Sequence, residues 1–138
     1  MTTVADAILA AVRAAVPGDV MVYDSIVPGV APARYVMMYI PAGARSSYSV
    51  DGTSDCVTVD FQVTTVVSSG DPSYTSAMCR WLTGTVIDAL TDLTVSADGV
   101  APARIVHRGS QGPRPDEATP DKKVYATDQF TLETVRTS

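Results

Sequence analysis

The sequence predicts an α+β fold in which a mixed, mostly antiparallel sheet carries two helices packed on one face. Two apolar patterns with helical spacing and several segments of alternating apolar and polar residues indicate this class. Thirteen of the 15 acidic residues are Asp, which is disfavoured inside helices and common in caps and turns. We therefore expect a chain rich in strands and loops rather than a helical bundle.

With 138 residues, 46% of them hydrophobic and 18% charged, the chain is expected to form a single domain over residues 1–138. No apolar run reaches the roughly 18 residues of a membrane-spanning helix, so no membrane segment is expected. The first residues also lack the basic stretch that begins a secretion signal. The formal net charge of −5 argues against a protein that clamps nucleic acid by neutralising its phosphates.

A first helix is expected over about residues 4–16. Thr3 and Asp6 have the spacing of a capping box, in which each side chain bonds to the backbone N–H of the other residue. Pro17-Gly18 is expected to end the helix. The apolar residues of this segment recur every four positions, at Val4, Ile8, Val12 and Val16.

Three strands are expected next: a short one over 19–24, a buried one over 35–40 and a long one over 56–67. In the long strand, Val and Phe alternate with Thr, Asp and Gln, which is typical of a strand with one wet face. A polar loop is expected over 41–55, and it contains the hairpin-type dipeptide Asp51-Gly52.

A second helix is expected to begin at Asp71-Pro72, because Asp caps helices and Pro suits the first helical position. Gly84 lies inside this helix, where it would allow a close approach to the sheet. An apolar stripe with alternating spacings of three and four marks the face expected to be buried: Met78, Trp81, Leu82, Thr85, Val86, Ala89, Leu90 and Leu93.

The C-terminal part predicts a short strand over 94–96, a turn at Asp98-Gly99 and a strand over 103–107. A second polar loop with three prolines is expected over 108–123. The last strand is expected over 124–136, with Val124, Ala126, Phe130 and Leu132 on its apolar face.

A hexapeptide occurs twice with identical letters, as residues 29–34 and 99–104. Each copy follows a helix and a short strand, and each precedes a buried strand, a polar loop and a long strand. The repeat predicts pseudo-two-fold halves, about residues 1–69 and 70–138, each with the order helix, strand, strand, strand. Coincidence, with proline favoured at strand entry, is the alternative.

Chemistry-bearing residues are sparse. Cys56 and Cys79 are expected to be two buried free thiols in a reducing compartment, with a bridge between them as the alternative. His107 is the only histidine, and no metal-ligand spacing includes it. Asp60 and Asp128 are expected to face solvent from mid-strand, with a facing carboxylate pair as the alternative. No catalytic residue, metal site or cofactor is predicted, and we expect a protein that is not an enzyme.

The two long polar loops are candidates for contacts with other subunits or partners, although a solvated loop is the alternative for each residue. Arg and Tyr are enriched at protein interfaces. The candidate interface residues are Arg45, Tyr48, Arg108, Arg114, Lys122 and Lys123.

The order of these segments resembles the tail terminator (tail completion) proteins of long-tailed bacteriophages. The resemblance lies in the N-terminal helix with its Pro-Gly stop, Val22-Tyr23-Asp24, the approach through proline to Tyr35-Val36, a long alternating strand over 57–67, a helix over 77–90 and a long C-terminal strand. It extends over nearly the whole chain and involves no catalytic motif.

The resemblance implies a structural virion protein of the tail or neck, assembled in the host cytoplasm. Such proteins form a hexameric ring on the last ring of the tail tube. The ring stops tube polymerisation and meets the head-side connector or stopper protein, while DNA only passes through its lumen. The family has no catalytic residues, cofactors or membrane contacts.

Two alternatives stay open. One is another neck or minor tail component of the same kind of particle. The other is a small ligand-binding or thioesterase-like enzyme domain, which would need a concave apolar pocket with convergent polar groups.

Overall fold

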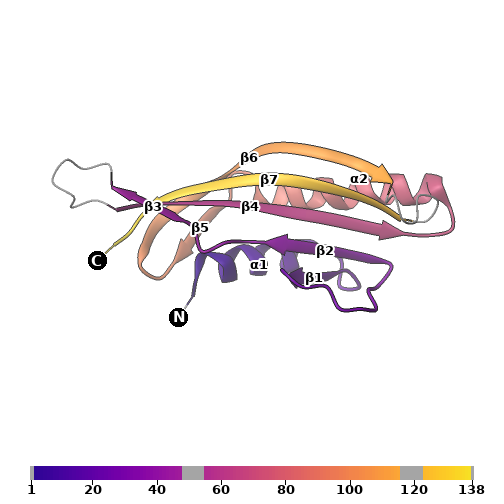
Figure 1. The fold of residues 1–138 in the computed structure, drawn as a ribbon, viewed down its shortest axis with the longest axis horizontal. Coiled ribbons are helices and arrows are strands. Elements are labelled where there is room, and N and C mark those ends of the chain that lie inside the picture. Colours follow the sequence, from indigo (N-terminus) through magenta and orange to yellow (C-terminus); the bar gives the residue numbers. More distant parts are fainter. Residues whose placement is uncertain (1, 48–54, 116–122, 138) are drawn as a thin grey trace.

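The computed structural model describes residues 2–47, 55–115 and 123–137, and its centre is a seven-stranded sheet (Figure 1). The strand order is β1-β2-β4-β7-β6-β5, and β3 pairs with β4 outside this path. Among the described strands only the β1–β2 pair is parallel, so the mixed, mostly antiparallel α+β class is confirmed. The elements are α1 (Val4–Ala15), β1 (Met21–Asp24), β2 (Arg34–Tyr39), β3 (Ala44–Ser47), β4 (Asp55–Ser68), α2 (Pro72–Leu90), β5 (Thr94–Ala97), β6 (Val100–Pro115) and β7 (Lys123–Val135).

Both helices begin at the predicted caps. The Thr3 hydroxyl accepts a hydrogen bond from the Asp6 backbone N–H, and the Asp6 carboxylate accepts one from the Thr3 N–H, so the capping box is confirmed. The Asp71 carboxylate accepts hydrogen bonds from the N–H groups of Ser73 and Tyr74, with Pro72 in the first turn. These contacts satisfy N–H groups that a helix start leaves without intrahelical partners.

The two helices contact each other and cover the same face of the sheet (Figure 1). Phe61 of β4 and Phe130 of β7 lie opposite each other on this face, and their rings stack with centroids 5.3 Å apart. Both rings are buried, together with aliphatic side chains from α1, α2 and six of the strands. This apolar layer between sheet and helices supplies most of the hydrophobic stabilisation.

No helix of the described residues covers the opposite face of the sheet, and polar side chains on that face pair across β4 and β7. Gln129 donates to Gln62 over 3.1 Å, and the Thr64 and Thr127 hydroxyls lie 3.3 Å apart. Directly opposed pairs of this kind stabilise neighbouring strands. The wet face predicted for β4 is therefore confirmed.

Both predicted polar loops are shorter than expected. Residues 44–47 of the first form β3, and residues 108–115 of the second extend β6. Pro113 and Pro115 fit in a strand here because no described strand pairs with the outer edge of β6 beyond the short β5, so no ladder N–H is missing. Two register shifts further loosen the β6–β7 pairing. The hairpin-type dipeptide at 51–52 lies outside the described residues.

The buried face of α2 is narrower than the predicted stripe. Cys79, Leu82, Val86 and Leu90 are buried, whereas Trp81 is 52% exposed, so its expected burial is wrong. Adjacent helical positions differ by about 100°, and only one of each neighbouring pair can face the sheet. A Cβ built on Gly84 would meet nothing within 4 Å, so this glycine is not needed for close packing.

The main path of strands is symmetric about the central β4–β7 pair, but the first half contains an additional strand, β3, which the predicted order helix, strand, strand, strand did not include. The two halves differ in strand direction, because β1 and β2 are parallel and β5 and β6 are antiparallel. The division at residues 69 and 70 stays a prediction.

Candidate assembly surface

The residues predicted to form an interface lie at separate places on the sheet. Arg45 on β3 is opposite Val57 of β4, whereas Lys123 is opposite Ser68, at the other end of the same strand. Eleven residue steps separate these levels, a distance of about 36 Å along β4. One compact patch therefore does not contain both basic residues.

Two further candidates lie on β6, where Arg108 and Arg114 are exposed. Arg114 is opposite Tyr125 of β7 and thus near Lys123, so these two candidates lie at the same end of the β6–β7 pair. Tyr48 and Lys122 lie outside the described residues. The interface role of all six stays a prediction.

A more distinctive feature, missed in the sequence, is an exposed apolar loop between β1 and β2, residues 25–33. Ile26 is 78% exposed and Val30 is 92% exposed. The segment contains no charged residue. Isolated exposed apolar residues are common, but two in one short uncharged loop suggest a surface that meets another protein. The sequence does contain a signal for this loop, because its Ile, Val and Pro residues follow neither helical nor strand periodicity.

A hollow of about 350 Å³ lies between α2 and the β6–β7 hairpin, and we call it the α2–β6 hollow. Its apolar lining comes from Ile87 of α2, Pro113 of β6 and Ala126 of β7. Gly84 forms an open part of the helix side, and Arg80 stands beside it, exposed to solvent. Such a concave, mostly apolar site can receive side chains or a small ligand.

Polar groups also line the hollow. Asp128 is only 1% exposed, and the predictions that it faces solvent or pairs with Asp60 are wrong. Asp128 is opposite Val63 on the helix-covered face, whereas Asp60 is opposite Thr131 on the helix-free face, where it is exposed as expected. Burial of a carboxylate requires hydrogen-bond donors.

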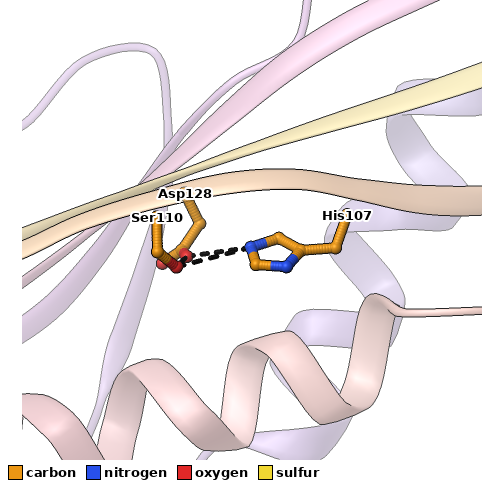
Figure 2. Close-up of polar contacts among 3 residues, drawn as sticks. All are labelled: His107, Ser110 and Asp128. Atoms are coloured by element: carbon orange, nitrogen blue, oxygen red, sulfur yellow. Dashed lines mark hydrogen bonds and ion pairs between the residues drawn. The ribbon is translucent and has the colours of Figure 1, made fainter.

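Figure 2 shows these donors, His107 and Ser110, converging on Asp128. The Nε2 atom of His107 lies 3.1 Å from one carboxylate oxygen, and the Ser110 hydroxyl donates to the same oxygen. The imidazole also packs on Phe130, with ring centroids 5.0 Å apart. The imidazole is therefore packed against the sheet, and the three side chains hold one another in place.

This cluster does not have the geometry of a hydrolytic triad. In a triad the hydroxyl bonds to one ring nitrogen and the carboxylate to the other, so that the imidazole can accept the proton of the nucleophile. Here the Ser110 hydroxyl and the carboxylate of Asp128 both approach Nε2 of His107, at 3.4 and 3.1 Å. The carboxylate of Asp128 occupies Nε2 of His107, the ring nitrogen that would have to accept the proton of Ser110.

Both cysteines are free thiols, as expected. Cys79 is buried under the sheet, and its Sγ lies 3.9 Å from the carbonyl oxygen of Thr65. Burial raises the pKa of the Cys79 thiol, so it stays protonated and unreactive at neutral pH. Cys56 is only partly buried, because it lies near the start of β4, so its expected burial is wrong.

Within the described residues, no group of three or more His, Cys, Asp or Glu side chains is arranged to hold a metal ion. Neither helix combines the length and hydrophobicity that a bilayer-spanning helix needs.

The comparisons with known proteins place the fold. The sequence matches no protein-family model and no curated protein. Among solved structures, 23 chains match. One is a chain from the virion of a native gene transfer agent particle, with a TM-score of 0.54 and 18% identity. The alignment covers 93% of this chain and 84% of that one. At this identity the similarity establishes a shared fold.

Proposed function

We propose that this chain is a structural subunit of a phage-type virion, and that within the particle it acts as a tail terminator. The observation that supports this is the fold shared with a gene transfer agent virion chain over 93% of the sequence. Because one fold can serve several functions, the site must support the function as well.

The surface supports assembly better than catalysis. The edges of the sheet are formed by the short β1 on one side and by β5 and the bulged β6 on the other. Exposed apolar residues gather beside β1, and the α2–β6 hollow opens beside β6. Unlike surfaces at two ends of one subunit give heterologous contacts, and these build a ring when the rotation closes.

In the proposed role, six copies form a ring on the last ring of the tail tube and stop its growth. The opposite side of the ring meets the connector or stopper protein of the head. DNA passes through the lumen, and the net charge of −5 disfavours tight binding to its phosphates. The protein would assemble in the host cytoplasm and remain in the tail or neck of the virion.

An enzymatic function has one feature in its favour, the α2–β6 hollow with Ser110 and Asp128 in its lining. The hydrogen bonds described above leave the serine without a free base, so hydrolysis by this cluster is disfavoured. We therefore place the structural role first.

Deletion of the gene tests the proposal, with complementation by the intact gene as the control. Electron microscopy should show tails of uncontrolled length without the protein. Ring particles from purified protein bound to tubes should have six copies of 14.5 kDa, about 87 kDa in total. Tails of normal length in the deletion strain that fail to join heads would refute tail termination and indicate another neck component.

A further inference from the structure

We propose that the ring closes through the exposed apolar loop of one copy, residues 25–33, seated in the α2–β6 hollow of the next copy. This contact rests on the proposed function, because it presumes a ring. It names the two surfaces that must meet and predicts which residues touch.

The loop is held at both ends, so it can present its apolar side chains in a fixed place. At its start, the Ser25 N–H donates to the Met38 carbonyl over 2.8 Å. At its end, the Ser68 N–H donates to the Ala33 carbonyl over 2.7 Å, and Arg34 forms an ion pair with Asp19. A surface that is already ordered loses little conformational entropy on binding.

The hollow offers the matching features. Its volume of about 350 Å³ and its lining by Ile87, Pro113 and Ala126 suit branched apolar side chains such as Ile26 and Val30. Gly84 has no side chain, and a Cβ built there would meet nothing within 4 Å. The helix surface at this position therefore leaves space for a side chain of the next copy.

Charge at the borders agrees with this arrangement. Arg80 lines the hollow and is exposed, and it forms no ion pair with the described part of the chain. Asp24, which precedes the loop, is also exposed, and its carboxylate accepts a hydrogen bond from Ser25 alone within the described residues. When the loop of one copy enters the hollow of the next, these opposite charges can face each other across the contact.

The strand register aligns the start of the loop with the wall of the hollow. Met38, which anchors the loop, is opposite Val63 of β4. Val63 is opposite Asp128 of β7, and Asp128 is opposite Ser110 of β6, at the wall of the hollow. These residues lie on β2, β4, β7 and β6, which are consecutive neighbours in the sheet (Figure 1).

Equal height matters for closure. A head-to-tail contact between surfaces at different heights adds a rise at each step and builds an open helix. A contact between surfaces at one height adds little rise, so repeated rotation can return to the first copy. In a ring whose axis runs along the strands, the shared row from Met38 to Ser110 would keep this rise small.

Disulfide trapping in assembled particles tests the contact. The double variant Ile26→Cys with Gly84→Cys, made with Cys56→Ser, is expressed in the deletion strain, and particles are oxidised and run on a denaturing gel. Ile26 is exposed and a Cβ at Gly84 meets nothing within 4 Å, so both substitutions should leave folding intact. We expect a ladder of cross-linked species up to the full ring.

The control pair is Ile26→Cys with Ser96→Cys, because Ser96 is exposed on β5, on the same edge as the hollow but beyond its lining. It should stay monomeric on the gel. Particles that contain the first double variant and have normal tails but show no ladder would overturn the contact while leaving tail termination standing. Absence of the wild-type chain from purified particles would overturn both.

A second variant, Ile26→Asp, checks the contact without cross-linking. In the proposed contact Ile26 is buried in the hollow of the next copy, so a charge at this position should weaken binding between copies by about tenfold or more. Sedimentation of the protein with tail tubes measures the amount that assembles on them. The control Val135→Asp introduces the same charge at a half-exposed position at the end of β7. Equal effects of the two variants would contradict a specific role for the loop.

Discussion

The buried carboxylate of Asp128 gives the most quantitative prediction, a double-mutant cycle with His107. His107→Ala removes the Nε2 donor 3.1 Å from a carboxylate that is only 1% exposed. Asp128→Ala removes the charge itself, and the double variant removes both. If the two side chains act as a unit, the loss in the double variant is smaller than the sum of the single losses.

The magnitude follows from the surroundings. A buried charged group that loses a hydrogen-bond partner costs about 1–3 kcal/mol or more. The His107 side chain is 26% exposed and Ser110 still donates to the carboxylate, so water and Ser110 replace part of the lost hydrogen bond. We expect His107→Ala to lower the free energy of unfolding by about 2–4 kcal/mol, including the lost contact with Phe130. The coupling with Asp128→Ala should be about 1–3 kcal/mol.

Urea denaturation at pH 7, followed by circular dichroism, measures the four free energies of unfolding. Asp60→Ala provides a matched control, because Asp60 is exposed on the other face of the sheet and bonds to Thr131 instead. Combined with His107→Ala, it should be additive within about 0.5 kcal/mol. Additivity of the same size between His107 and Asp128 would refute the reasoning that the cluster acts as one unit.

Three further predictions concern the backbone, the thiols and the first helix cap. Gly112→Ala should lower the free energy of unfolding by more than about 1 kcal/mol, because φ is +118° and an added Cβ would lie 2.8 Å from the β7 backbone. Gly84→Ala should raise it by up to about 1 kcal/mol, and similar Tm values for the two variants would contradict this account. In the folded protein, a thiol reagent should modify Cys56 at least about tenfold faster than the buried Cys79, and equal rates would show that the site opens readily. Thr3→Ala should reduce the free energy of unfolding by about 1 kcal/mol, and an unchanged urea midpoint would mean that the capping box adds nothing.

Local patterns explain which parts of the fold could be predicted. The caps at Thr3 and Asp71 depend on residues within one helical turn, and both are present in the structure. The strand over 55–68 follows from strict alternation, which fixes its two faces wherever it pairs. These signals act over a few residues, so the sequence contains them in full.

The edges of the sheet could not be predicted for the opposite reason. Residues 108–115 contain two prolines, and such a segment is a poor strand unless one edge is free. Whether an edge is free depends on the length of β5 and on its pairing with β6, which is a long-range property. The same holds for β3, whose partner is the start of β4.

The burial of Asp128 could be predicted in part, because it depends on both a local pattern and a long-range pairing. Its even position places it on the same face as Ala126 and Phe130, so the alternation already pointed into the core. The expectation of solvent exposure came from the cost of burying a charge. His107 and Ser110 offset that cost, and only the pairing of β6 with β7 brings them to Asp128.

The candidate assembly surface depends on exposure, which a single sequence does not reveal. The apolar residues of the 25–33 loop could equally have belonged to the core, and only the folded chain shows that Ile26 and Val30 remain outside it. The core around Phe61 and Phe130 is complete without them. Substitutions in this loop should therefore change assembly and leave the free energy of unfolding nearly unchanged.

This separation makes the two groups of experiments informative together. Asp128 lines the α2–β6 hollow and also belongs to the buried polar cluster, so variants of Asp128 or His107 alter stability and the hollow at once. Ile26 lies in the loop on the opposite edge, and Gly84 lines the hollow with open space above it. A loss of assembly in variants of Ile26 that unfold at the wild-type urea concentration would locate the effect in the contact between copies. If assembly is lost only in variants that weaken the Asp128 cluster, the cause is reduced stability of the fold instead.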